Sequence, residues 1–333
     1  MRISTGSIMQ RYNRNLSKAI GNLDSSRIKV LTNRNFNTIA EDPAAAAKSF
    51  KLRREYNQTA DHVKNIEDTI SLFDNLAAGA LDVSTMLTQD VNEDVLRAVN
   101  GATGAEAREA YAKSLRGVQE TIVLSLNAKY GDRYLYGGAS TKEAPFAFDP
   151  ETNKLTYRGL DVNDPANQAQ LEQMMGETLY VDLGFGLNED AGQNLLPNTA
   201  FNTAASGLSI LGFGQHADGA SKNVVVLLGQ MADELEKDPL DLEKFNGLLD
   251  HFNVSKNDAA DYVSELGTRS QFLEDTKKIL TDQQDTLNEQ IIDVEDVDMA
   301  AAISEYVWQQ YAYNAALKVG TSILSPSFID FMS

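Results

Sequence analysis

Residues that could carry out chemistry are sparse in this chain of 333 residues. The three histidines, His62, His216 and His251, lack a second metal ligand at helical or hairpin spacing. The chain has no cysteine, which excludes disulfides, thiolate zinc sites and a cysteine nucleophile. No serine or lysine lies in a nucleophile motif either. We therefore predict no catalytic, metal-binding or cofactor-binding residues, and we expect a structural protein rather than an enzyme.

Three short patterns resemble ligand motifs but lack essential parts. Asp161-Val162-Asn163-Asp164 begins like a calcium loop, yet the following glycine and the distal glutamate of an EF-hand are missing. Gly184-Phe185-Gly186 and Gly212-Phe213-Gly214 lack the third glycine and the strand–turn–helix context of a phosphate site. An acid cluster near the C-terminus is interpreted as a solvated helix face: Asp293, Glu295, Asp296 and Asp298. A calcium or ligand site in the middle of the chain remains an open alternative.

The elements around these residues are mainly helical, and the C-terminal part shows a strict seven-residue repeat. Such a repeat is typical of helices that wind around each other. Intermediate positions such as Ser270, Lys277 and Gln284 are polar, which indicates one narrow apolar seam. The alternative is a set of ordinary globular helices in which the seven-residue spacing arises by chance. The repeat consists of Leu266, Leu273, Leu280, Leu287, Val294, Ala301, Trp308 and Ala315.

The N-terminal part has the same character. Residues 8–31 read as an amphipathic helix, in which Leu16, Leu23 and Val30 are seven positions apart and Tyr12 and Ile20 lie four positions before and after Leu16. Residues 32–42 read as a break. Asp42 can then cap a helix that starts at Pro43, because proline fits the first helical position.

This next helix has no proline over residues 44–99 and would extend ~80 Å at the α-helical rise. Residues 105–129 form a second amphipathic pattern after a short glycine-containing turn, which predicts an antiparallel return.

The middle of the chain changes to short alternating runs separated by glycine and proline. Residues 133–136, 154–157 and 178–183 read as strands. Helices are expected again over Val224–Leu235, Leu240–Phe252 and, as one long helix, over residues 254–313.

These patterns predict a mainly α fold, a long antiparallel helical bundle or coiled coil formed by the N- and C-terminal segments, with a small β-rich inserted domain. The expected parts are a terminal helical assembly region of residues 1–42 and 299–333, a helical rod of 43–140 and 221–298, and a β-rich insert of 141–220.

Charge is unevenly distributed along the chain, whose net charge is −19. Residues 1–60 hold eleven basic and four acidic side chains, whereas the remainder is strongly acidic. A basic N-terminal helix and an acidic C-terminal segment are suited to pairing, and the acidic whole argues against nucleic-acid or membrane binding. We expect no membrane span and no cleavable signal peptide at the N-terminus, so that secretion would use another route.

Four segments resemble the flagellin family: residues 1–5, the helix start at Glu41-Asp42-Pro43, residues 130–138, and residues 322–331. Glu41 and the loop 31–40 depart mildly from the family pattern, and residues 147–220 do not match it. The motif residues are Asp42, Pro43, Gly131, Arg133, Tyr134, Tyr136, Gly137, Gly138, Pro145 and Phe146.

The resemblance implies an extracellular flagellar protein, most similar to the branch of the family that joins the hook to the filament. Its partners would be copies of itself in a ring, the adjacent hook-associated protein, flagellin or a second junction protein, and a cytoplasmic export chaperone. The expected assembly residues are Tyr12, Leu16, Ile20, Leu23, Val30, Val294, Trp308, Ala315, Leu317, Ile323, Leu324, Phe328, Ile329 and Phe331.

Residues 1–30 and 290–333 are expected to be poorly ordered in the free monomer, because their apolar stripes lack sufficient partners within one chain. Two other functions stay open: a filament flagellin, or a coiled-coil surface adhesin or binding module with a β-rich head.

Overall fold

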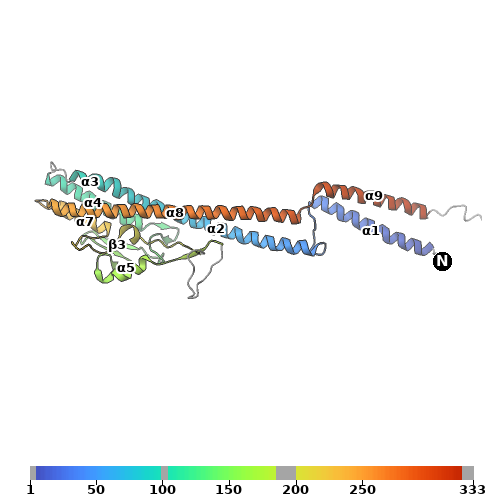
Figure 1. Cartoon of the computed structure of the whole chain (residues 1–333), viewed down its shortest axis with the longest axis horizontal. Helices are drawn as coiled ribbons and strands as arrows, with labels where there is room; N and C mark the ends of the chain where they lie inside the picture. Colours follow the sequence, from blue (N-terminus) through green and yellow to red (C-terminus); the bar gives the residue numbers. More distant parts are fainter. Residues whose placement is uncertain (1–4, 99–103, 185–199, 325–333) are drawn as a thin grey trace, which may run out of the picture. The chain divides into compact units, whose positions relative to one another are not determined.

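The computed structural model describes residues 5–98, 104–184 and 200–324. The fold is mainly helical, as the sequence predicts, and it divides into two compact units (Figure 1). The first unit combines residues 1–60 with 281–333, and the second comprises residues 61–280. Two long helices, α2 (Pro43–Thr85) and α8 (Leu242–Glu295), contribute to both units. No helix in the described ranges is both long and apolar enough to cross a membrane.

In the first unit, α1 (Thr5–Thr32) and α9 (Met299–Leu324) lie side by side (Figure 1). The pairing is antiparallel. Tyr12, near the start of α1, packs on Gly320, near the end of α9. At the opposite ends, the amide of Val297 donates to the carbonyl of Asn33 over 3.2 Å. Next to this pair, Leu52 of α2 packs with Leu287 and Ile291 of α8.

The start of α2 follows the prediction. The backbone amide of Ala45 donates to the Asp42 carboxylate over 2.9 Å, and Pro43 is the first residue of the helix. In the preceding break, the Glu41 carboxylate accepts from the amide of Asn37 over 2.8 Å. Asn33 takes a positive φ of 56°, which ends α1.

The predictions of a separate helix over Leu240–Phe252 and of one unbroken helix over 254–313 are both wrong. At its start, α8 continues upstream because Phe245, Phe252 and Ala259 extend the same seven-residue seam and are fully buried. Towards its end, the chain leaves the helix after Glu295 and starts α9 at Met299. Asp298 caps α9 by accepting from the amide of Ala300 over 2.8 Å.

The predicted helix 44–99 is likewise interrupted. A single π-helical turn, η1 (Met86–Val91), separates α2 from α3 (Asn92–Ala98). The cause is an apolar spacing of exactly four residues, which in an α-helix rotates the stripe by about 40° at each step. The wider π turn keeps the four residues on the core side, and all are fully buried: Val83, Leu87, Val91 and Val95.

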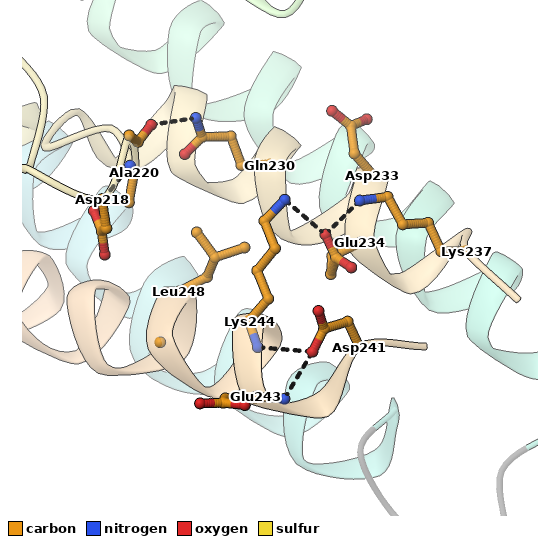
Figure 2. Close-up of a pocket in the computed structure, with 12 residues that line it drawn as sticks. Asp218, Ala220, Gln230, Asp233, Glu234, Lys237, Asp241, Glu243, Lys244 and Leu248 are labelled. Carbon is orange, nitrogen blue, oxygen red and sulfur yellow. Dashed lines mark hydrogen bonds and ion pairs between the residues drawn. The ribbon is translucent and has the colours of Figure 1, made fainter. Parts of the chain in front are cut away.

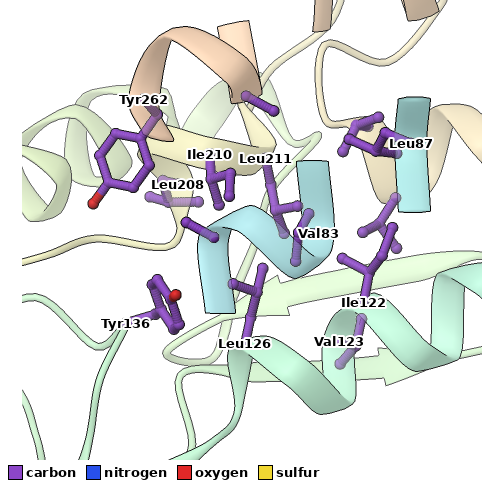
Figure 3. Packing of buried hydrophobic residues seen from close by; sticks show 14 of the residues in the cluster. Val83, Leu87, Ile122, Val123, Leu126, Tyr136, Leu208, Ile210, Leu211 and Tyr262 are labelled. Atoms are coloured by element: carbon purple, nitrogen blue, oxygen red, sulfur yellow. The ribbon is translucent and has the colours of Figure 1, made fainter. Parts of the chain in front are cut away.

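The return helix α4 (Ala105–Leu126) closely matches its predicted range. Ser114 donates to the carboxylate of Asp94 in α3, as expected for an antiparallel neighbour. Figure 3 shows Ile122 and Leu126 in the core shared with Val83 and Leu87. Helix α7 (Val224–Leu235), whose bounds agree with the sequence prediction, also packs on α4.

Short strands in the second unit form small antiparallel sheets. The hairpin β1 (Lys129–Tyr130) and β2 (Arg133–Tyr134) follows α4 directly. The predicted strand 154–157 is β4, and the predicted strand 178–183 is shortened to β6 (Tyr180–Asp182). The described residues also include β3 (Phe146–Asp149) and β5 (Leu160–Asp161), which flank β4, and β7 (Ala200–Asn202), which pairs with β6. Three short helical segments lie between or after them: η2 (Pro165–Asn167), α5 (Gln168–Met175) and α6 (Leu208–Leu211).

Candidate assembly interface

The seam between α1 and α9 uses positions that alternate three and four residues apart, which is the spacing of a helix pair. Most of these residues are only partly buried, so the pairing is thin. In α1 the seam comprises Met9, Tyr12, Leu16, Ala19, Leu23, Ser26 and Val30; in α9 it comprises Ala302, Tyr306, Gln309, Tyr313, Ala316 and Gly320.

The closest approach in this seam requires glycine. A Cβ added to Gly320 would lie 1.9 Å from the hydroxyl oxygen of Tyr12. Any larger residue would therefore push the tyrosine ring out of the seam.

The predicted seven-residue repeat changes sides at the break between α8 and α9. In α8 its members from Leu266 to Leu287 are buried, and Val294 is half-buried. In α9 its members Ala301 and Ala315 are exposed, and Trp308 is 73% exposed. The seam instead contains residues 302, 309 and 316, one position later, because the segment 296–298 resets the register.

Exposed apolar side chains therefore cover much of the outer surface of this helix pair. Ile20 and Leu317 belong to this exposed set, whereas Tyr12, Leu16, Leu23 and Val30 lie in the seam. Ile323 and Leu324 are in the last turn of α9. Phe328, Ile329 and Phe331 lie outside the described residues. The exposed outer members are Ile8, Ile20, Ile28, Leu31, Met299, Ile303, Val307, Trp308, Tyr311, Leu317 and Val319.

The interpretation of the acid cluster as a solvated face is wrong for Glu295. This residue is only 6% exposed, and its carboxylate receives two bonds of 2.6 Å from Arg53 and one from Ser49. Arg34 lies 3.9 Å away. The hydrogen bonds from Arg53, with smaller contributions from Ser49 and Arg34, lower the pKa of Glu295 to about 2. The sequence could not indicate this site, because its members are far apart in the chain.

The flagellin-like segment 130–138 joins α4 to the small sheets. Tyr136 is fully buried, and its hydroxyl donates to the carbonyl of Leu76 in α2 over 2.6 Å. Gly137 is needed for close approach, since a Cβ there would lie 2.0 Å from the carbonyl oxygen of Ser140. Gly138 donates its amide to the carbonyl of Ala205 over 2.9 Å.

The remaining motif residues are also structural. Gly131 lies in the turn between β1 and β2, whose second strand contains Arg133 and Tyr134. Phe146 is buried and exchanges two hydrogen bonds with the Asn127 side chain at the end of α4. The carbonyl of Pro145 accepts from the amide of Arg158.

The weak ligand motifs are occupied by internal contacts. Asp161 pairs with Lys154 at 3.2 Å, and Asp164 accepts from the amide of Ala166 as the cap of η2. Gly212 and Gly214 pack against the chain at Lys222. Gly184 follows β6, and the rest of its pattern lies outside the described residues.

Two of the histidines that are distant in sequence stack in space. The rings of His216 and His251 have centroids 3.9 Å apart, and His251 Nε2 lies 2.8 Å from Asp218. Burial, with the neighbouring His251 and Lys222, lowers the pKa of His216. Over the described ranges, no group of three or more His, Cys, Asp or Glu residues is arranged to hold a metal ion.

A polar cavity of about 640 Å³ lies between α7 and the start of α8 (Figure 2). Glu234 in its wall is buried, and one carboxylate oxygen contacts Lys237 at 2.7 Å and Lys244 at 3.3 Å. This arrangement holds the two helices together through the ion pair of Glu234 with Lys244.

Two family models match the chain. The bacterial flagellin N-terminal helical region matches residues 3–141, and the bacterial flagellin C-terminal helical region matches residues 253–325. Together they cover more than half of the chain, including α1, α9, most of α8 and the motif residues up to Tyr136, Gly137 and Gly138.

Individual relatives agree. Flagellar hook-associated protein 3 of Escherichia coli is 24% identical over 325 residues, covering 97% of each chain. Flagellin A of Vibrio anguillarum is 27% identical over 152 residues, covering 45% of this chain and 39% of its own. A putative flagellar hook-associated protein from Vibrio parahaemolyticus has the same fold, with a TM-score of 0.60 and 17% identity, over 77% of this chain and all of that one. The chain belongs to the flagellin family, and it is a homologue of flagellar hook-associated protein 3 over nearly its whole length.

Proposed function

We propose that this chain forms a junction ring between the flagellar hook and the filament, with paired terminal helices as the assembly element. Its family membership makes it a structural, extracellular component of the bacterial flagellum and not an enzyme. The observation that carries the junction role is the length of the match: the hook-associated relative is matched over 97% of both chains, the flagellin relative over less than half.

The exposed face of α1 and α9 supports self-assembly. A large aromatic side chain such as Trp308, exposed at 73%, is characteristic of a contact that is buried in an assembly. Neighbouring copies in a ring are therefore the first proposed partners. The adjacent hook-associated protein would bind on one side of the ring, and flagellin or a second junction protein on the other.

We propose that an export chaperone covers the same apolar face before secretion, since a cytoplasmic pool with this surface exposed would associate non-specifically. The proposed parts are the assembly region 1–42 with 299–333, the helical rod 43–140 with 221–298, and the β-rich insert 141–220.

Deletion of residues 324–333 tests the assembly role of the C-terminal end. The truncated protein is expected to keep the core of the second unit, because that core lies within residues 61–280, and to fail in joining hook and filament. Near-ultraviolet circular dichroism checks the fold, and electron microscopy of complemented cells checks joining. Filament growth on the truncated protein would exclude this end as an interface.

A further inference from the structure

Glu295 occupies a position that its own helix does not favour. It is the last residue of α8, where the unpaired carbonyls give the helix end a partial negative charge. A carboxylate there is repelled unless cations or hydrogen-bond donors offset it. Its burial at 6% exposure increases the cost of the charge. The residue is therefore explained by its contacts with other segments.

These contacts come from two other segments of the first unit. Ser49 and Arg53 are four residues apart on one face of α2, and both donate to the Glu295 carboxylate. Arg53 does so through two nitrogens, each at 2.6 Å, which is the bidentate geometry that only arginine provides. Arg34 lies in the segment between α1 and α2. Its guanidinium is 3.9 Å from the Glu295 carboxylate and adds a second positive charge beside Arg53.

The backbone around Glu295 ties the same segments together. The carbonyl of Glu295 accepts from the amide of Asn35 over 2.7 Å, and Arg34 forms an isolated β-bridge with Asp296. The amide of Val297 donates to the carbonyl of Asn33 over 3.2 Å. We call the Glu295 carboxylate with Ser49, Arg53 and Arg34 the Glu295 clamp, and residues 33–35 with 296–297 the crossed linkers.

Two registers compete immediately beyond the clamp. If α8 ran straight into α9, the seven-residue repeat would continue through Ala301, Trp308 and Ala315. In the structure, positions 302, 309 and 316 face α1 instead, and Trp308 points outward. The continuous register would place Trp308 in line with the buried leucines of α8, and burial of a tryptophan is favoured by the hydrophobic effect. The observed register therefore needs contacts that hold it.

We propose that the Glu295 clamp is this device: it positions the crossed linkers, sets the register in which α1 and α9 leave them, and so keeps Trp308 on the outer surface. Glu295 is a positioning residue, since it acts through the linkers and does not touch an assembly partner. The members of the clamp lie outside the paired helices: Arg34 follows α1, Ser49 and Arg53 belong to α2, and Glu295 precedes α9.

Amide exchange on the purified full chain tests the clamp. In Glu295→Gln, which keeps the shape but removes the charge, the amides of Asn35 and Val297 should exchange about tenfold faster. Arg53→Lys keeps the positive charge but loses the pair of hydrogen bonds from two nitrogens, so a smaller increase in the exchange rate of these amides is expected. The matched controls are Glu289→Gln, an exposed acid on α8, and Arg54→Lys, the exposed neighbour of Arg53; both should leave these amides unchanged.

Two results would overturn the clamp. One is unchanged exchange at Asn35 and Val297 in Glu295→Gln. The other is equal acceleration at the Leu266 and Leu273 amides of the second unit, which would indicate a general loss of stability.

The register is tested by fluorescence, because Trp308 is the single tryptophan of the chain. The measurement is made in a stabilising osmolyte, which strengthens burial and favours pairing of α1 with α9. Glu295→Gln should shift the emission to the blue and reduce iodide quenching about twofold, as the continuous register buries Trp308. Glu289→Gln should match the parent protein. Identical quenching in Glu295→Gln and Glu289→Gln would show that the clamp does not set the register.

Discussion

At the scale of single residues, two buried polar groups of the described part of the chain connect segments that are distant in sequence. Glu295 joins α8 to α2 and to the linker after α1, and Tyr136 joins the flagellin-like segment to α2. Both groups are satisfied by donors or acceptors, as burial requires. Their loss should therefore affect specific connections.

Tyr136→Phe removes one buried hydrogen bond and leaves the carbonyl of Leu76 without that donor. The expected cost is about 1–2 kcal/mol in the free energy of unfolding. Tyr130→Phe is the matched control, since Tyr130 is exposed, and it should cost less than about 0.5 kcal/mol. Urea unfolding of both variants measures the difference. Equal stability of the two variants would mean that the Tyr136 hydroxyl contributes nothing.

Glu295 should make the stability of the first unit dependent on pH. Its pKa is lowered to about 2 in the folded chain, below the value of about 4.3 for an unfolded glutamate. The folded state therefore binds fewer protons, and the stabilisation is complete above about pH 4.5 and is lost as the pH falls towards 2. Arg53 and Arg34 are each about half exposed, so we expect about 2 kcal/mol rather than the full Coulombic gain.

The measurement is the difference in unfolding free energy between the parent protein and Glu295→Gln at several pH values. The difference should be constant from pH 5 to 7 and should shrink below pH 4. A difference that stays constant down to pH 2.5 would contradict the ionised clamp.

At the scale of elements, the sequence predicted helices whose bounds depend on local signals. The Asp42-Pro43 start of α2 and the whole of α7 are confirmed, because a cap and a dense apolar run are visible within a few residues. The π turn η1 was missed, because apolar residues spaced four apart are compatible with an α-helix as well as with a π turn. The short strands β3 and β7 were also missed, because pairing with β4 and β6 defines them more than their own composition.

The break between α8 and α9 shows why a repeat alone cannot place a seam. The apolar residues continue at intervals of seven through 301, 308 and 315, but the crossed linkers shift the contact by one position. That shift depends on Arg34, Ser49 and Arg53, which are more than 200 residues away in the chain. The expected assembly residues divide accordingly into seam and outer surface, and their role in assembly stays a prediction.

The thin seam of α1 and α9 predicts weak protection in the free monomer. Its core contains small or polar residues such as Ala19, Ser26, Gln309 and Gly320, so little apolar area is buried. Amides of Leu16, Leu23 and Leu317 should exchange within seconds to minutes in the monomer and become protected on assembly. Strong protection of these three amides in the monomer would contradict the expectation of poor order.

Trp308→Ala should weaken assembly without destabilising the monomer, because the side chain is exposed. A central tryptophan commonly contributes about 2 kcal/mol or more to an interface, which is about 30-fold in affinity. Leu124→Ala in α4 is the control, since Leu124 is 75% exposed and lies outside the terminal helices. Motility of cells complemented with each variant, together with thermal unfolding of each monomer, gives the comparison. Equal motility of the two strains would remove Trp308 from the interface.

At the scale of the whole molecule, charge and apolar surface are distributed for assembly. The basic excess within residues 1–60 and the acidic remainder are present in one chain of net charge −19. Such an acidic protein stays soluble through self-repulsion, while opposite charges on neighbouring copies can meet. The fold class and the family were predictable from the sequence, because the terminal helices and the segment 130–138 carry strong patterns.

The proposed junction of hook and filament is tested most directly in a strain from which this chain is deleted. Hooks and secreted flagellin are examined by electron microscopy and by immunoblotting of the medium. We expect hooks without filaments and monomeric flagellin shed into the medium, with both defects reversed by the intact chain. Normal hooks bearing normal filaments in the deletion strain would contradict this proposal.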